Sequence, residues 1–180
     1  MISLRSKITQ SVLNYFMLQQ GAEIYVSDFA RITQLESGNL TRKLADLEKD
    51  GILKSRWQGN QRYYSLNKNF PLLKEYRSIV LKTVGFEQIL RNALSKISGI
   101  KKAIIFGSYA QDKMDSYSDI DLLIVGEHST ITLQRGIADV QKTIHREINA
   151  VSMSLQEYAA KKRNDPFLMS IESKKSIKIL

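Results

Sequence analysis

Two short apolar runs with polar residues between them constrain the fold more than any other part of this sequence. The runs are Ala103–Phe106 and Ile120–Val125, and their length and bounds are typical of buried strands. Two aspartates two positions apart, Asp119 and Asp121, stand at the start of the second run. Because side chains alternate along a strand, we expect both carboxylates on one face of a sheet.

The first run ends in Gly107 and Ser108, where the chain turns towards a helical segment. A glycine lets the backbone approach a phosphate closely, and the Ser108 hydroxyl and the amides that open the next helix can donate to it. Two aligned carboxylates can hold a divalent cation through their oxygens. A metal-bound triphosphate beside these groups is placed for in-line phosphoryl or nucleotidyl transfer.

The pattern as a whole resembles the minimal nucleotidyltransferases of the DNA polymerase β superfamily. Gly107-Ser108 is followed, after ten residues, by Asp119-x-Asp121. The resemblance covers roughly residues 85–180 and implies a nucleotidyltransferase-fold α/β domain with a small mixed sheet. It also implies Mg²⁺ and a nucleoside triphosphate as cofactors, Asp119 and Asp121 as catalytic metal ligands, and Gly107, Ser108 and Ser118 as nucleotide-binding residues.

The family places a third carboxylate on a following strand, and here that strand is predicted over Ile148–Met153. Asn149 stands at the expected position. An amide is neutral, a weaker metal ligand and no base. Glu147 is expected on the same face, about 6–7 Å away by the rise of a strand, but its position departs from the pattern. The resemblance therefore implies nucleotide binding with weak or absent catalysis.

The first seventy residues predict three helices and a hairpin. The first helix ends near Gly21, the second runs from Asp28 to about Ile32 with Ser27 as its cap, and the third begins at a Ser37 cap and ends at Gly51. Two extended runs, Ile52–Gln58 and Gln61–Leu66, flank Gly59-Asn60, which suits a short hairpin turn. We expect Trp57, Tyr64 and Leu66 of this hairpin to pack on the helices.

Residues 37–53 and 59–66 resemble small prokaryotic winged-helix repressors of the ArsR type, and the resemblance covers residues 5–68. It implies a winged helix-turn-helix module that binds duplex DNA, often as a homodimer, with its second helix in the major groove. The expected DNA-binding residues are Ser37, Asn39, Arg42 and Lys43 on that helix and Arg56, Asn60 and Arg62 on the hairpin. The alternative is a solvated basic surface or a protein-binding module.

The charge balance agrees with a polyanionic partner but does not identify it. Lys and Arg number 27 against 18 Asp and Glu, which gives a net charge of +9. The chain has no cysteine, so metal sensing by thiolates is not carried over from the repressors. No apolar run reaches the roughly 18 residues of a membrane span, and the first residues lack a secretory signal, so we expect a cytoplasmic protein.

The expected organisation is α+β, with three parts. Residues 1–70 form the winged helix-turn-helix domain, residues 71–84 a connecting helix, and residues 85–180 the nucleotidyltransferase-like domain. Residues 71–96 are expected to be mainly helical with a break at Gly85, and residues 130–145 helical. The last elements are expected to be a helix over Leu155–Lys162, a helix over Pro166–Ser173 and a strand over Ile177–Leu180.

The leading hypothesis is a DNA-binding transcriptional regulator with a nucleotidyltransferase-like domain that binds Mg²⁺ and nucleotide. The alternative is an active nucleotidyltransferase that moves a nucleoside monophosphate (NMP) onto a protein, RNA or small molecule, including the antitoxin type with a protein partner. A third alternative is a nucleic-acid scaffold that binds no nucleotide.

Overall fold

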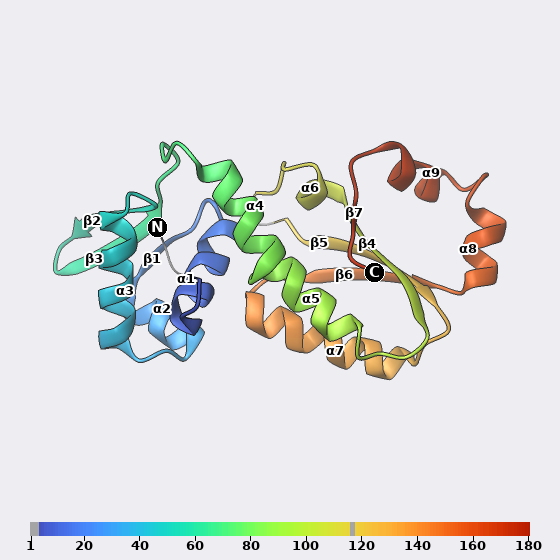
Figure 1. Cartoon of the computed structure of the whole chain (residues 1–180), viewed down its shortest axis with the longest axis horizontal. Helices are drawn as coiled ribbons and strands as arrows, with labels where there is room; N and C mark the ends of the chain where they lie inside the picture. The colour runs from blue at the N-terminus through green and yellow to red at the C-terminus, as the bar shows by residue number, and fades with distance from the viewer. Residues whose placement is uncertain (1–3, 116–117) are drawn as a thin grey trace. The chain divides into compact units, whose positions relative to one another are not determined.

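The computed structural model describes residues 4–115 and 118–180. The chain forms two compact units, Met1–Gln88 and Ile89–Leu180 (Figure 1). None of the helices in the described residues is long and apolar enough to cross a membrane.

The first unit combines helices with a three-stranded antiparallel sheet of order β1-β3-β2. Its elements are α1 (Lys7–Leu18), β1 (Glu23–Tyr25), α2 (Val26–Thr33), α3 (Ser37–Lys49), β2 (Leu53–Gln58), β3 (Gln61–Leu66) and α4 (Leu73–Thr83). The predicted helices and the hairpin are therefore present. β1 was not expected, because three residues are too few to show a strand periodicity. It extends the sheet by pairing Ile24 with Tyr64.

The starts of two helices correct the sequence prediction. Glu36, not Ser37, is the N-cap of α3, because its carboxylate accepts hydrogen bonds from the backbone N–H groups of Gly38 and Asn39, both at 2.7 Å. Ser37 is already helical. α2 begins at Val26, one residue before the predicted Ser27 cap, and its N-cap, Tyr25, makes no side-chain capping bond.

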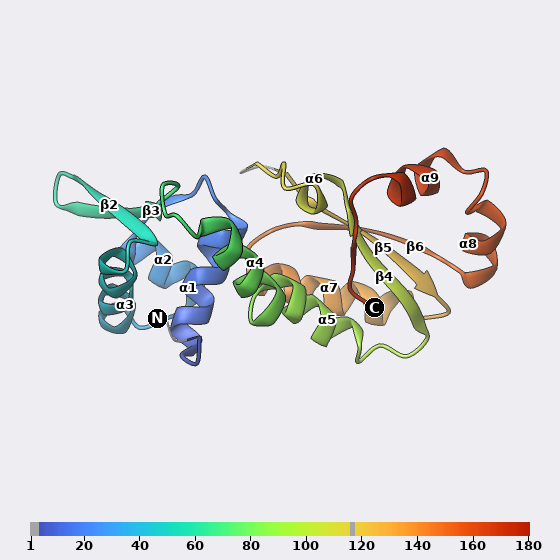
Figure 2. The same ribbon diagram turned by 45° about the horizontal axis from the view of Figure 1, so that its top comes forward.

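The core of the first unit lies between α1, α2, α3 and the sheet, and the fully buried residues include Phe16, Phe29, Leu44 and Tyr64. Tyr64 and Leu66 pack inside as predicted. The prediction for Trp57 is wrong, because its side chain is 66% exposed. It precedes the turn at Gly59 by two residues, and the outer end of the hairpin projects beyond the helices (Figure 2).

The second unit is built on a mixed four-stranded sheet of order β6-β5-β4-β7, as the resemblance implied. Only β5 and β6 run parallel. The elements are α5 (Phe86–Leu94), β4 (Ile100–Phe106), α6 (Gly107–Ala110), β5 (Ile120–Gly126), α7 (Thr130–Ile144), β6 (Ile148–Met153), α8 (Leu155–Lys161), α9 (Pro166–Ser173) and β7 (Ile177–Lys178). Helix α5 follows the predicted break at Gly85 and begins before the unit boundary.

Helices cover both faces of this sheet. On one face Leu123 and Val125 of β5 pack with Met153 of β6 and with Leu168 and Ile171 of α9. The opposite face is covered by α5 and α7 (Figure 2). Alternation places Asp121 on the same face as Leu123, at the start of β5, beside Phe106 at the border of the apolar cluster. This end of the strand carries the candidate site.

We expect Leu123→Ala to lower the free energy of unfolding of the second unit by about 2–5 kcal/mol, because a fully buried side chain leaves a cavity under α9. Its register partner on β6, Val151, is 41% exposed, so Val151→Ala should change the free energy by about 0.5 kcal/mol or less. Urea unfolding followed by circular dichroism measures both. Equal losses would contradict the assigned packing of α9.

Candidate active site

Three polar side chains meet where β5 and β6 begin. Asp119 directly precedes β5, Asp121 is its second residue, and Asn149 is the second residue of β6. The strand register pairs Asp121 with Asn149 on one side and with Phe106, the last residue of β4, on the other. The sheet therefore brings together the three residues that the sequence singled out on separate segments.

Asn149 makes direct contact with the acidic pair. Its Nδ2 donates a hydrogen bond to Oδ2 of Asp119 at 3.1 Å. An ionised carboxylate at this position has no proton to donate and would repel Asp119 instead. The amide thus brings the positive end of a dipole to an acid that was predicted from the sequence to bind a metal ion.

Keeping both aspartates ionised at this site is electrostatically unfavourable. Partial burial, and secondly the negative charge of Asp119, raise the pKa of Asp121 above its usual value. A divalent cation beside the pair would relieve the repulsion and favour the ionised form.

Gly107 leaves the space that Asp121 occupies. Its φ is +71°, and a Cβ atom there would overlap Oδ2 of Asp121. A side chain at this position would therefore be strained and would also displace the carboxylate. The sequence explained the glycine by a close approach to phosphate, and the structure adds a second reason. Ser108 follows in the first turn of α6.

Ser118 directly precedes Asp119 and the start of β5. Its hydroxyl donates to Oδ1 of Asp115 at 2.8 Å, and its backbone N–H donates to the same oxygen at 2.7 Å. Nη1 of Arg146 donates to the carbonyl oxygens of Asp115 and Ser118 at 3.2 and 2.7 Å. Arg146 is only 9% exposed, and sequence reasoning missed it, because an arginine next to a strand has no pattern that distinguishes it from a surface residue.

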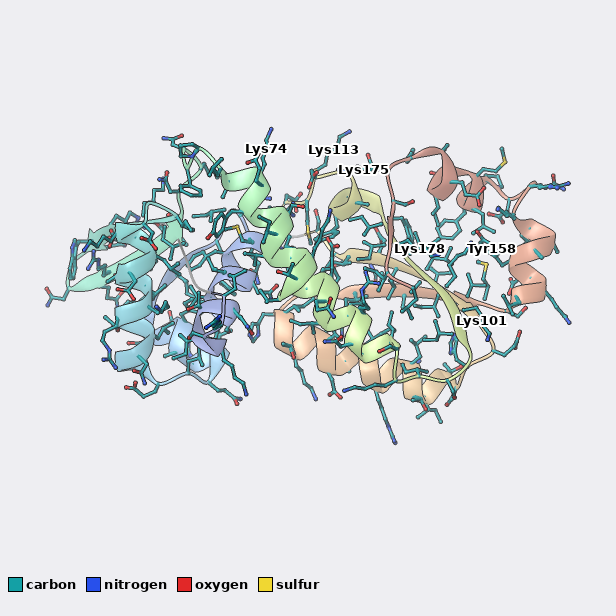
Figure 3. The ribbon with its side chains drawn as sticks, in the orientation of Figure 1. Lys74, Lys101, Lys113, Tyr158, Lys175 and Lys178 are labelled. Atoms are coloured by element: carbon teal, nitrogen blue, oxygen red, sulfur yellow. The ribbon has the colours of Figure 1, made fainter. Side chains whose placement is uncertain are left out.

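Lysines near α6 add positive charge to this end of the unit (Figure 3). Lys175 forms an ion pair with Asp112 at 2.8 Å, which brings it close to the neighbouring Lys113. Lys178 of β7 pairs with Ile104 of β4, two residues before Phe106, and therefore lies on the same face of the sheet as Asp121. Sequence reasoning missed Lys113, Lys175 and Lys178, since only the strand order places them here.

The side chains at this site fit a metal ion that takes its remaining ligands from substrate phosphates and water. Within the described residues, no group of three or more His, Cys, Asp or Glu side chains is placed to hold a metal. Asp119 and Asp121 supply two carboxylates, and the pKa of Asp121 is raised first by partial burial and then by Asp119, so a cation would stabilise its ionised form. Mg²⁺ is commonly held by one or two carboxylates together with substrate phosphates and water, which matches this set.

The predicted DNA-binding residues divide into two groups. On α3, Ser37, Asn39 and Arg42 are exposed, with Arg42 donating to Oδ1 of Asn39, while Lys43 pairs with Asp46 at 3.0 Å. On the hairpin, both arginines are bonded to carboxylates of the protein itself. Arg56 donates to both carboxylate oxygens of Glu23, at 2.7 and 2.6 Å, and lowers the pKa of that acid.

The second hairpin arginine, Arg62, is held in the same way. It donates to Glu48 at 2.5 Å and to the Ser55 hydroxyl at 3.0 Å. Asn60 lies in the turn between β2 and β3. The hairpin arginines therefore offer less free charge to phosphates than the sequence suggested.

Comparison with known proteins bears on the second unit. No curated protein matched the sequence. Among solved structures, the chain is similar to one described as the crystal structure of a toxin–antitoxin with AMP-PNP, with 15% identity over 52% of this chain and 72% of that chain and a TM-score of 0.40. It is also similar to a putative nucleotidyltransferase from Sulfolobus solfataricus, with 22% identity over 41% of this chain and 68% of that chain and a TM-score of 0.29.

The resemblance of residues 5–68 to winged-helix repressors has no counterpart in these comparisons and stays a prediction. The resemblance of the second unit is confirmed at the level of the family. Residues 87–179, just over half of the chain, match the family described as "Nucleotidyltransferase domain". Because this match covers more than half of the chain, including Asp119, Asp121 and Asn149, the chain belongs to the nucleotidyltransferase domain family.

Proposed function

We propose that the protein is a nucleotidyltransferase that moves an NMP group from a nucleoside triphosphate onto an acceptor hydroxyl. The observation that carries the proposal is the pair of carboxylates, Asp119 and Asp121, on one face at the start of β5. The family match at residues 87–179 supports transfer more directly than it supports transcriptional regulation, which was the leading hypothesis from the sequence.

In the proposed reaction the acceptor oxygen bonds to the α-phosphorus, the bond from that phosphorus to pyrophosphate breaks, and the acceptor proton passes to solvent. Asp119 and Asp121 would hold Mg²⁺, which when bound neutralises phosphate charge and polarises the phosphoryl oxygen. Ser108 and the backbone N–H groups beside it would orient the phosphates. Lys113 and Lys178 would offset the remaining negative charge.

Asn149 limits the rate in this proposal. Its amide cannot accept a proton from the acceptor, so no side chain at this position acts as a general base. Transfer by the natural protein is therefore slow, or depends on an acceptor that ionises readily. Incubation with labelled nucleoside triphosphates, Mg²⁺ and cell extract tests the function and shows whether the acceptor is a protein, an RNA or a small molecule. No labelled product with any of the four nucleotides would contradict it.

We expect Asn149→Asp to increase the transfer rate at saturating nucleotide, because it supplies the missing base. General-base assistance contributes roughly 10²–10⁴-fold, and even a tenth of this is measurable. Self-labelling and hydrolysis of the nucleotide are the first reactions to measure.

Asn149→Ala is the matched control, since it removes the bond to Asp119 without adding a base. A fast natural rate that falls in Glu147→Gln would instead show that Glu147 is the base.

We expect Asp121→Asn to have opposite effects on the empty and the loaded protein. Without ligand at pH 7 it should raise the melting temperature, because it removes a charge that burial and Asp119 disfavour. The pKa of Asp121 is raised in the folded state, so this gain should shrink as the pH falls through that pKa towards the ordinary value of 3.8.

In the presence of Mg²⁺ and nucleotide, the natural protein gains about 2.7 kcal/mol at a hundred times Kd, and the Asp121→Asn variant should gain little. Thermal unfolding with and without ligand measures both effects. Asp139→Asn is the control, because Asp139 is an exposed acid on α7 and should change neither. An unchanged ligand response in Asp121→Asn would mean that the aspartates do not hold the metal–nucleotide.

For the first unit we propose duplex DNA binding through α3. The support is the element order α1-β1-α2-α3-β2-β3, the sheet order β1-β3-β2, and the exposed polar residues at the start of α3, which match a winged helix-turn-helix. The winged-helix assignment and a homodimer remain part of this proposal.

We expect Arg42→Ala to weaken duplex binding and to reduce the slope of log affinity against log salt by about 0.9, the value of one phosphate contact. Arg31→Ala is the control, because Arg31 is also exposed but lies on α2, where it pairs with Asp28. Fluorescence anisotropy with a labelled duplex at several salt concentrations measures both slopes. Equal slopes in the two variants would argue against α3 as the binding element.

A further inference from the structure

Trp57 is the only tryptophan of the chain and is 66% exposed. It is a cross-strand partner of Arg62, near the turn of the β2–β3 hairpin. A single exposed apolar residue needs no explanation. Trp57 differs because its contacts are with a cation that the protein holds in place.

Arg62 is fixed beside the indole. Its guanidinium carbon lies 5.6 Å from the centre of the Trp57 ring and 5.2 Å from that of Tyr64. The hydrogen bonds to Glu48 and Ser55 hold this guanidinium in position. The indole is therefore supported by a fixed cation while most of its surface stays in water.

The other face of the hairpin repeats this arrangement. The guanidinium carbon of Arg56 lies 5.1 Å from the centre of the Tyr63 ring and is held by Glu23. The Tyr63 ring lies 5.9 Å from that of Tyr25. Aromatic rings interleaved with arginines are typical of surfaces that bind single-stranded nucleic acid.

The alternation of aromatic rings with arginines, rather than free charge, favours nucleic acid over protein as the partner. Residues 53–66 contain three basic residues and no acidic residue. Because Arg56 and Arg62 are already bonded to carboxylates, the hairpin is better equipped to stack on a base than to hold phosphates. The bases of a duplex are already stacked on one another, whereas an unpaired base has a free ring face.

We propose that Trp57, supported by Arg62, is a stacking platform for an unpaired base of single-stranded nucleic acid. The platform lies on the β2–β3 hairpin, whereas duplex reading is proposed for the start of α3 and nucleotide transfer for the second unit. The proposal does not depend on either of them.

The single tryptophan makes the test direct. Titration of the full-length protein with oligothymidylate or oligouridylate should quench the fluorescence of Trp57, because a stacked base lies against the indole. A duplex of the same length should leave the fluorescence nearly unchanged. Arg42→Ala should keep the response to single strands even where duplex binding is lost, so failure of the α3 proposal and of this one can be told apart.

Affinity for a labelled single strand, measured by anisotropy, should fall roughly 5- to 150-fold in Trp57→Ala, the range of one lost stacking contact. Trp57→Phe should keep most of the affinity, since its ring can still stack. Ile131→Ala is the control, because Ile131 is 63% exposed but lies on α7 of the other unit. Circular dichroism checks that each variant is folded.

Three results would overturn the proposal. Equal affinity of Trp57→Ala and the natural protein would show that the indole does not bind the strand. Quenching by a duplex as strong as by a single strand would point to groove contact instead. A fluorescence change that follows protein concentration without nucleic acid would assign the exposed indole to contact between copies of the chain.

Discussion

The register across β4, β5 and β6 is the constraint on which the candidate site depends. It places Phe106, Asp121 and Asn149 in one row, and Asp119 next to that row. A shift of one residue in β5 would turn both aspartates towards the face covered by α5 and α7, and would turn Leu123 away from α9. The same alternation that packs the apolar cluster therefore also presents the acids, so the register of the core fixes where the acids lie.

Gly107 shows how tightly the loop after β4 is coupled to this row. Its positive φ turns the chain into α6, and its missing Cβ leaves room for the carboxylate of Asp121. On the other side, Arg146 donates to the carbonyl oxygens of Asp115 and Ser118, and Ser118 directly precedes Asp119. The two acids are thus positioned from opposite directions. Their mutual repulsion is opposed only in part by the amide of Asn149, which is why this end of the sheet favours a cation.

Much of the second unit could be predicted from the sequence, because the patterns that define it lie within short segments. Apolar runs indicate buried strands, and two acids two positions apart on a strand share one face of the sheet, whatever the rest of the fold. Three features could not be predicted: the cap at Glu36 and the strand β1 in the first unit, and the hydrogen bonds of Arg146 in the second. A glutamate is a rarer cap than a serine, a three-residue strand has no period, and Arg146 gains its partners only after folding brings residues 115 and 118 beside it.

The net charge of +9 suggested polyanion binding throughout the chain, and the structure changes where that charge is available. In the hairpin, Arg56 and Arg62 are bonded to Glu23 and Glu48, so their charges are largely satisfied within the protein.

In the second unit, Lys113 and Lys178 form no ion pair within the described part of the chain, and Lys178 lies on the face that carries the aspartates. A triphosphate held with Mg²⁺ by two acids still carries excess negative charge, and free ammonium groups on that face can offset it. The sequence alone therefore assigns too much phosphate-binding capacity to the hairpin and too little to the sheet edge at β7. The reason is that the fold decides which cations are already paired with acids.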